Sequence, residues 1–231
     1  SFMMATAVVI PAYKPDESLL DLLRALRERT FIDSLVVVDD GSGPQYESIF
    51  AQAAQLCTLK RHAQNRGKGA AIRTGLEALG GAYNVVTADC DGQHTPSDIE
   101  KIARAIDGAL VLGVRRKREM PLRSKMGNTL TCLTFALVSH RWISDTQTGL
   151  RGIPQSFLEV CRQLEGDRYE YEMHMLLEAC RRGLPIREVE IETVYIDNNR
   201  GSHFHALRDG KRIYRLLLGW KKKLRAEKKK P

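Results

Sequence analysis

The sequence predicts an α/β protein built on a doubly wound, mostly parallel sheet with helices on both sides. In the first half of the chain, short apolar runs alternate with longer amphipathic segments, which is the βαβα pattern of such sheets. The runs are almost entirely apolar, as strands are when both faces of a parallel sheet are covered. Polar, glycine-containing loops follow several of these runs, at the carboxyl ends where ligands bind in open α/β sheets.

The first predicted strand covers residues 7–10 and stops at Pro11, and a helix over 15–29 follows with its leucines on one face. The second strand, over 35–38, is an uninterrupted apolar run that is too short for a helix. The alternation continues with a helix over 44–56, a weak strand near 57–61, a helix over 69–80, a central strand over 83–88, a helix over 96–106 and a strand over 109–113. A chain of 231 residues can bury one large domain of this kind.

The second half of the chain begins with apolar residues at helical spacing, namely Leu122, Met126, Leu130, Leu133 and Leu137. The nearly apolar stretch over 129–138 is too short to span a bilayer, so it is a core helix or an interfacial helix. Of these two we favour the core. A further amphipathic helix begins at Glu170 and ends before Gly183 and Pro185, and residues 186–196 alternate like a half-exposed strand.

We expect three segments: residues 1–6, 7–205 and 206–231. Residues 1–6 are set aside as a start that does not belong to the fold, since Ser1-Phe2 before Met3 has the look of an expression remnant. Residues 7–205 form the α/β domain, and residues 206–231 form a basic amphipathic helix and tail. The chain has a net charge of +8, and residues 200–231 contribute twelve Lys or Arg against two acids, or +10, which leaves −2 for residues 1–199. A nucleic-acid-binding module would have a basic body, so this distribution argues against one.

The tail places Ile213, Leu217, Trp220 and Leu224 on one face of a helix and Lys and Arg on the others. A basic amphipathic helix with Trp on its apolar side is typical of attachment to an anionic membrane surface. The alternative is a helix that packs on the sheet and ends in a solvated tail. No stretch is long and apolar enough to cross a bilayer, so we expect peripheral attachment.

The five cysteines are scattered, odd in number and without metal-binding spacing. They are therefore expected to be reduced thiols of a cytoplasmic protein.

Two carboxylates, Asp89 and Asp91, follow the central strand at positions i and i+2, where both point to the same side. They repel each other unless a cation lies between them, and oxygen ligands suit Mg²⁺ or Mn²⁺ better than zinc. Gln93 adds a neutral oxygen two residues further on. The alternative is a polar loop in which Asp89 caps a neighbouring group and Asp91-Gly92 forms an ordinary turn.

Two further loops have the composition of nucleotide-binding segments. Asp39-Asp40-Gly41-Ser42 follows the second strand and resembles the acidic loop that holds a ribose or base, although the same residues also make a good turn and helix cap. Residues 65–71 place two glycines and two cations at the start of a helix, where backbone N–H groups can receive phosphate. The spacing of a P-loop is absent.

Taken together and in order, these motifs resemble a family 2 inverting glycosyltransferase of the GT-A fold. The resemblance runs from about residue 7 to residue 215. Its Asp-Cys-Asp-Gly-Gln-His form is similar to that of the dolichyl- or polyprenyl-phosphate sugar synthases. The six motifs are Val-Val-Ile-Pro-Ala-Tyr, Val-Val-Val-Asp-Asp-Gly-Ser, Asn-Arg-Gly-Lys-Gly, Ala-Asp-Cys-Asp-Gly-Gln-His, Gly113-Val-Arg115 and Asp145-Thr-Gln-Thr-Gly-Leu-Arg151-Gly.

The resemblance implies a nucleoside-diphosphate sugar as donor, a polyprenyl phosphate as acceptor and a divalent cation as cofactor. It implies a nucleotide site at the ends of the first strands, with Asp39 at the base, formed by Pro11, Tyr13, Asp39, Lys68 and Asp89. It also implies that Asp89, Asp91 and Gln93 hold the cation, which offsets the charge of the leaving nucleoside diphosphate. The closest rival is a family 2 transferase with a soluble or glycan acceptor. The sugar, the nucleotide and the oligomeric state are not indicated.

On the acceptor side, the resemblance makes Asp145 the candidate catalytic base, although a phosphate acceptor needs little deprotonation. Otherwise Asp145 is a helix cap or a partner of Arg151. Arg115 and Arg123 have the guanidinium geometry that binds phosphate, unless they are ordinary surface charges.

Two segments beyond residue 169 each have two interpretations. The carboxylates of Glu170 and Glu172 either orient arginines in the site or favour the amino end of their helix. The loop over 198–204, with Arg200, Ser202 and His203, is either a lid over the nucleotide or an ordinary polar loop.

Overall fold

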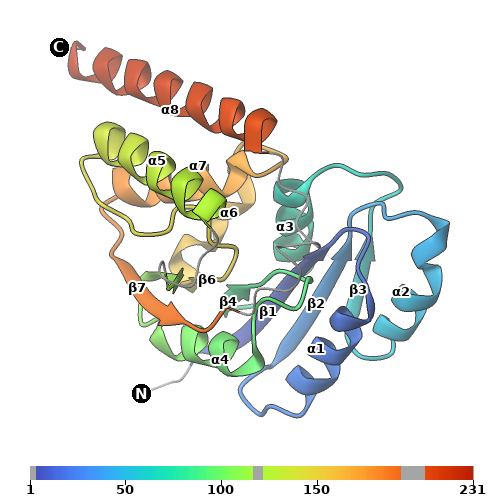
Figure 1. The fold of residues 1–231 in the computed structure, drawn as a ribbon. Coiled ribbons are helices and arrows are strands. Elements are labelled where there is room, and N and C mark those ends of the chain that lie inside the picture. The colour runs from blue at the N-terminus through green and yellow to red at the C-terminus, as the bar shows by residue number, and fades with distance from the viewer. Residues whose placement is uncertain (1–3, 117–121, 194–205, 231) are drawn as a thin grey trace.

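A seven-stranded sheet runs through the molecule in the order β3-β2-β1-β4-β6-β5-β7, with helices on both of its faces (Figure 1). The structure is a computed structural model that describes residues 4–116, 122–193 and 206–230. All neighbouring strands are parallel except β6, which is antiparallel to both β4 and β5. The predicted fold class, a mostly parallel sheet flanked by helices, is therefore confirmed. The strands are β1 (Ala5–Ala12), β2 (Ser34–Asp39), β3 (Thr58–Arg61), β4 (Tyr83–Thr87), β5 (Leu110–Arg115), β6 (Arg151–Ile153) and β7 (Ile186–Ile191).

Two hydrophobic clusters, one on each face of the sheet, hold the layers together. Alternate residues of β1 divide between them, since Val9 belongs to one cluster and Val8 to the other. Helices α1, α2 and α4 cover one face, and α3, α5, α6 and α7 lie on the other side, with α8 packed against α5 and α7 (Figure 1). The helices are α1 (Glu17–Arg27), α2 (Glu47–Ala53), α3 (Lys68–Glu77), α4 (Pro96–Ala105), α5 (Leu122–Ser139), α6 (Leu158–Gln163), α7 (Glu170–Arg181) and α8 (Ala206–Lys228), with short 3₁₀ turns at Pro44–Tyr46 and Gln155–Phe157.

Strand β6 is the main element that the sequence does not predict. It has three residues and lies between β4 and β5, so the predicted strand over 109–113 does not pair with the central strand directly. Three residues carry no usable periodicity. Gly152 is needed there, because a Cβ at this position would collide with the side chain of Ile106 at the end of α4. β1 also begins at Ala5, two residues before the predicted start.

The favoured expectation that the leucine stripe of α5 is buried in the core is wrong. The stripe faces outward, with exposures from 50% at Leu133 to 73% at Leu122 and Leu137. The opposite face of the helix is the buried one, and it contributes Cys132 and Phe135 to the core. Both faces of α5 are thus apolar, and periodicity alone cannot tell which of two apolar faces meets the protein.

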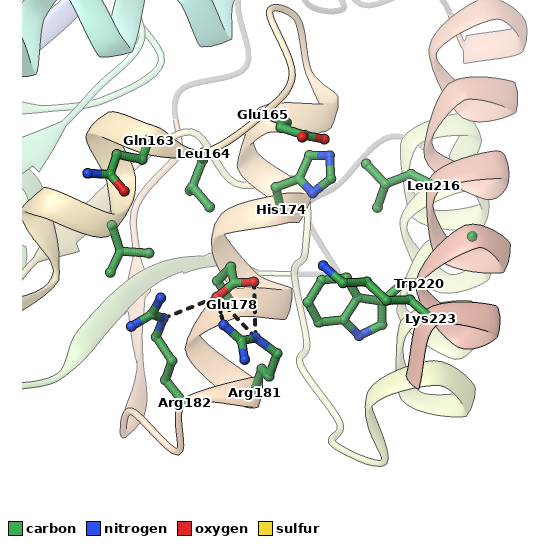
Figure 2. Close-up of a pocket in the computed structure, with 12 residues that line it drawn as sticks. Gln163, Leu164, Glu165, His174, Glu178, Arg181, Arg182, Leu216, Trp220 and Lys223 are labelled. Carbon is green, nitrogen blue, oxygen red and sulfur yellow. Dashed lines mark hydrogen bonds and ion pairs between the residues drawn. The ribbon is translucent and has the colours of Figure 1, made fainter. Parts of the chain in front are cut away.

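Helix α8 packs against α5 and α7 with the apolar face that was expected to enter a membrane. Leu217 is 1% exposed and Trp220 is 9% exposed, and both belong to the core cluster. Figure 2 shows Leu216 and Trp220 of α8 facing His174 of α7. The alternative of packing on the protein therefore holds, although α8 lies on neighbouring helices and not on the sheet.

None of the helices in the described ranges has both the length and the hydropathy that crossing a bilayer requires.

Candidate functional site

A cluster of partly buried charges lies at the carboxyl edge of the sheet, beside the end of β4. The ammonium nitrogen of Lys68, the first residue of α3, lies 2.7 Å from Oδ1 of Asp89 and 2.9 Å from Oε1 of Glu172, in the first turn of α7. The backbone N–H of Asp89 donates to Nδ1 of His94 at 3.1 Å. Nδ1 therefore carries no proton, which agrees with burial lowering the pKa of His94. The cluster joins β4, α3 and α7, which are far apart in the sequence.

The charges in this cluster hold one another ionised. Burial by itself raises the pKa of Asp89, but the adjacent Lys68, helped by His94 and Arg115, lowers it to about 2. Burial likewise disfavours the charged form of Lys68, but the carboxylates of Asp89 and Glu172 outweigh it and hold the lysine pKa above its usual value. Lys68 and Asp89 thus hold each other in the charged form in a partly buried site.

Asp91 differs from Asp89 because desolvation dominates its environment. Its burial, followed by the nearby charge of Asp89, raises the pKa of Asp91 to about 6. Its Oδ1 accepts a hydrogen bond from the backbone N–H of Gln93 at 3.2 Å, across the turn that Gly92 makes with a positive φ of 80°. The turn reading of Asp91-Gly92 is thus correct, and it still leaves the carboxylate beside Asp89.

This donor set fits a hard divalent cation that shares its coordination with a ligand. Within the described ranges, no group of three or more His, Cys, Asp or Glu side chains forms a closed metal cage. Asp89, Asp91 and the amide of Gln93 are the candidate protein oxygens. Mg²⁺ is typically held by one or two carboxylates together with substrate phosphates and water, so a site this open is suitable. The raised pKa of Asp91 means that a nearby positive charge would stabilise its ionised form.

Arg115 and Asp145 form a buried bidentate pair at the end of β5. Nε of Arg115 donates to Oδ2 of Asp145 at 2.6 Å, and its NH2 group donates to Oδ1 at 3.0 Å. Asp145 is almost completely buried. Neither predicted alternative for Asp145 is correct in detail, since its arginine partner is Arg115 and not Arg151. The pair places the candidate base and the candidate phosphate-binding arginine in contact.

Arg151 fixes the loop over 145–149. It is fully buried, and its guanidinium donates to the carbonyl oxygens of Thr146, Thr148 and Glu172 at 2.6–3.1 Å. Burial lowers the pKa of Arg151 and the neighbouring carboxylates, Glu172 first, raise it; an arginine stays charged in either case. Gly149 in the same loop lies against Asp89, because a Cβ at this position would collide with the Asp89 carboxylate.

Asp40 organises the loop that carries Lys68. Its two carboxylate oxygens accept hydrogen bonds from the backbone N–H groups of Arg66 and Gly67, both at 2.9 Å, and from the side chain of Asn65 at 2.9 Å. Oδ1 is also 2.8 Å from Nδ1 of the buried His62. Asp40 thus has a structural role next to Asp39, because its hydrogen bonds anchor the start of α3 to the end of β2.

The amino end of α3 is covered by a neighbouring loop. The N–H of Ala70 donates to the carbonyl oxygen of Asp167 at 2.9 Å, and a Cβ at Gly67 or Gly69 would collide with the loop over 166–168 or with Tyr171. Phosphate binding by the first N–H groups of this helix was one interpretation of residues 65–71. In this structure the Asp167 carbonyl already accepts the hydrogen bond of one of these N–H groups, that of Ala70.

Asp39 is buried at the end of β2, and both of its oxygens are engaged. Oδ1 accepts the backbone N–H of Ser42 at 3.0 Å, and Oδ2 is 3.3 Å from Nε of Arg61 on β3. Pro11 lies in β1 beside the same edge, and Tyr13 follows this strand with the ammonium of Lys14 5.2 Å from its ring centre. The N–H of Lys14 donates to the hydroxyl of Ser42 at 2.9 Å, so the loops after β1 and β2 meet. Their role as a nucleotide site stays a prediction.

Four of the predicted site residues lie outside what the structure describes. The backbone of Arg123 belongs to α5, but its side chain is outside the described set. The proposed lid residues Arg200, Ser202 and His203 fall in the range 194–205, which is not described. Their roles stay predictions.

A separate groove of about 530 Å³ lies between α8 and the α6–α7 region (Figure 2). His174, Glu178 and Trp220 line it, and Glu178 is paired there with Arg181 and Arg182. None of the residues of the charge cluster lines this groove. It is a packing gap beside α8 and not part of the charged site.

The sequence reasoning missed the roles of Gly149, Arg151 and His94. Arg151 was considered only as a partner of Asp145, and His94 only as part of a motif. A signal for both is that each lies within two residues of a glycine in a motif that also contains a candidate acid. Glu172 was expected either to orient arginines or to favour the amino end of its helix. Its carboxylate lies 3.7 Å from Nε of Arg151, while its closer partner is Lys68 at 2.9 Å, which was not anticipated.

The sequence matches the family model described as "Glycosyl transferase family 2" over residues 7–170. It is similar to the UDP-N-acetylglucosamine–dolichyl-phosphate N-acetylglucosaminyltransferase of Methanococcus voltae, with 32% identity over 238 residues that cover 91% of this chain and 94% of that protein. It is also similar to the dolichyl-phosphate beta-glucosyltransferase of Saccharomyces cerevisiae, with 26% identity over 228 residues that cover 84% of this chain and 68% of that protein.

The fold is similar to that of glucosyl-3-phosphoglycerate synthase from Mycobacterium tuberculosis, whose crystal structure holds Mn²⁺, uridine diphosphate and phosphoglyceric acid. The TM-score is 0.71 with 20% sequence identity, over 94% of this chain and 77% of that one. A second structure of that enzyme, with Mg²⁺ and uridine diphosphate, gives a TM-score of 0.67 with 18% identity, over 94% of this chain and 78% of that one. At this identity the likeness concerns the fold alone.

Proposed function

The chain belongs to glycosyl transferase family 2 and is a glycosyltransferase, and from this premise we propose that it transfers a sugar from a nucleoside-diphosphate sugar to a polyprenyl phosphate. We propose further that the reaction inverts the anomeric centre and depends on Mg²⁺ or Mn²⁺. The reaction would take place at the cytoplasmic face of a membrane, with the protein attached peripherally. The cytoplasmic side is favoured by the five cysteines, which are all free thiols.

The observation that supports this proposal best is the charge cluster at the carboxyl edge of the sheet. A donor and an acceptor that both carry phosphate need cations on two sides of the sugar. Lys68 lies on the side of Asp89 and the nucleotide loops, and Arg115 lies at the end of β5. Two relatives with dolichyl-phosphate in their names support the lipid acceptor, and the Mn²⁺ and Mg²⁺ complexes of the structural neighbour support the cation.

In this proposal, the residues of the chain hold and orient two anions. Pro11, Tyr13 and Asp39 contact the nucleoside, and Lys68 lies near the diphosphate. Asp89, Asp91 and Gln93 would hold the divalent ion, which supplies positive charge to the leaving nucleoside diphosphate when bound. The fixed charges need no rearrangement as negative charge builds up on the leaving group, and such preorganisation lowers the barrier.

Arg115 and Asp145 would act together on the acceptor. A polyprenyl phosphate is already anionic at neutral pH, so its oxygen attacks without losing a proton to a base. Asp145 then serves chiefly to hold the guanidinium of Arg115 in one orientation, because the two are joined by a bidentate pair. Asp145 would act as a general base only for a hydroxyl acceptor.

A soluble phosphate acceptor is the second candidate, since the structural neighbour binds phosphoglyceric acid. Mass spectrometry decides between the two. The purified enzyme is incubated with a panel of nucleoside-diphosphate sugars and either short-chain prenyl phosphates or small phosphorylated acids. A glycosylated prenyl phosphate supports the proposal. If product forms only on the small acids, the lipid acceptor is contradicted, while the glycosyltransferase activity stands.

Asp39→Ala is expected to weaken the binding of the donor nucleotide. Loss of a hydrogen bond with a buried polar partner costs roughly 1–3 kcal/mol, which corresponds to a fall in affinity of about 5- to 150-fold. Isothermal titration with a panel of nucleoside diphosphates measures this. Arg61→Gln removes the neighbour that contacts Asp39 from β3, and serves as the control for indirect effects. Unchanged affinity of Asp39→Ala for every nucleotide would refute the role.

Arg115→Lys is expected to raise the acceptor KM by about tenfold or more, while donor affinity stays as in wild type. Lysine keeps the charge but cannot reproduce the planar fork that now faces Asp145. Arg116→Lys is the matched control, because Arg116 pairs with Glu190 in a more exposed position. The measurement is steady-state kinetics with each substrate varied in turn. A change confined to the donor would assign Arg115 to the diphosphate.

A further inference from the structure

Helix α5 presents a continuous apolar stripe to the outside of the molecule. Its members recur every three or four residues along one face, and each is at least half exposed, namely Leu122, Met126, Leu130, Leu133 and Leu137. Monomeric soluble proteins rarely expose an apolar patch of this extent without a partner. Because the other face of α5 already fills the core, the stripe adds nothing to the fold.

The polar groups of this helix are satisfied internally. The hydroxyls of Thr129, Thr131 and Thr134 donate to the backbone carbonyls four residues earlier, at 2.8–2.9 Å. Such back-bonded hydroxyls lose little when water is removed. From Gly127 to Ser139 there is no charged residue, a length of roughly 20 Å at 1.5 Å per residue. This stretch can therefore leave water without an unpaired polar group.

Basic residues lie at both ends of the uncharged stretch of α5 and on the neighbouring helix α8. Lys125 precedes the uncharged stretch, and Arg141 follows it. Helix α8 packs beside α5 and carries the exposed basic residues Lys221 and Lys222 (Figure 1). It also exposes two apolar side chains, Tyr214 at 56% and Leu218 at 43%. An apolar stripe with basic flanks is complementary to the surface of an anionic bilayer, where acyl chains lie beneath a negative headgroup layer.

We propose that the outer face of α5 is the surface on which this protein docks on an anionic lipid bilayer, with Leu130, Leu133 and Leu137 inserted and the basic residues of α8 in the headgroup layer. The inserting element is thus α5, and the apolar face of α8 is engaged within the protein. The inference deepens the proposed function, because it rests on a lipid acceptor and states how the site reaches it. Its vesicle-binding test stands without any catalysis.

The test compares the full chain with three variants by cosedimentation with vesicles of phosphatidylcholine and phosphatidylserine across a salt series. Leu130→Ser/Leu137→Ser removes two exposed leucines and no core contact. Met4→Ser removes an exposed apolar residue just before β1, which belongs neither to α5 nor to α8. Lys221→Gln/Lys222→Gln removes charge from α8. Thermal unfolding confirms that all variants are folded.

We expect the affinity of the leucine variant for vesicles to fall by about tenfold or more at every salt concentration, since each leucine inserts apolar surface. The lysine variant loses only the part of binding that high salt also removes in wild type, and Met4→Ser binds like wild type. Wild-type binding by the leucine variant, or no vesicle binding by the wild-type protein, would overturn the proposal. So would sedimentation that shows a wild-type dimer and a monomeric leucine variant with unchanged vesicle binding, because the stripe would then bind a second copy.

Turnover separates this proposal from the proposed function. The leucine variant should keep wild-type turnover on short, water-soluble prenyl phosphates and lose it on long ones presented in vesicles. If vesicle binding depends on the stripe but no prenyl phosphate is glycosylated, the docking surface stands and the lipid acceptor fails. If prenyl phosphates are glycosylated and the stripe has no effect on vesicle binding, the acceptor stands and the docking surface fails.

Discussion

Asp91→Asn is expected to lower turnover by roughly 10²- to 10³-fold, the scale for losing one preorganised electrostatic contact to the leaving group. Asparagine has the same shape and can still accept the hydrogen bond from the N–H of Gln93, so the turn should persist. What is lost is the negative charge that, together with Asp89, would hold a divalent cation. The site is otherwise unchanged, so the effect reports on charge.

Two measurements test the assignment. Excess EDTA should abolish turnover of the wild type, and added Mg²⁺ or Mn²⁺ should restore it. Electron paramagnetic resonance should detect bound Mn²⁺ in wild type with a nucleoside diphosphate and much less in Asp91→Asn, a result that does not depend on activity. Asp107→Asn, at an exposed position, is the matched control. Full activity in excess chelator would remove the cation from the proposal.

Lys68→Met is expected to have the largest effect on stability and to abolish activity as well. The ammonium of Lys68 is shared by the partly buried carboxylate of Asp89 and the buried carboxylate of Glu172, and methionine fills a similar volume without charge. Removal of one member of a buried ion pair costs about 3–5 kcal/mol, because the remaining charge is left without compensation. The free energy of unfolding should fall by that amount near neutral pH.

Urea unfolding followed by circular dichroism measures the effect. Lys101→Met is the matched control, because Lys101 is exposed and donates to a single carbonyl, that of Glu190, at 2.8 Å. A change within about 0.5 kcal/mol is expected for it. Lys68→Arg, which keeps the charge, should retain more stability than Lys68→Met. Equal stability of Lys68→Met and wild type would show that the two carboxylates do not depend on Lys68.

The class of fold and the loops of the candidate site could be predicted from the sequence alone. Apolar runs followed by Asp39 and Asp89 could be read directly, because a strand buried on both faces admits no polar residue until its end. In a parallel sheet these ends share one edge, so the acidic loops had to lie near each other.

Only the tertiary structure decided which charges are paired and which apolar faces are covered. Asp145 pairs with Arg115, and Lys68 with both Asp89 and Glu172, because β6 and α7 bring distant segments to one edge of the sheet. Periodicity reports which residues share a face of a helix, but not what lies against that face. For this reason the apolar face of α8 is buried while the leucine stripe of α5 is exposed, the reverse of what we favoured from the sequence.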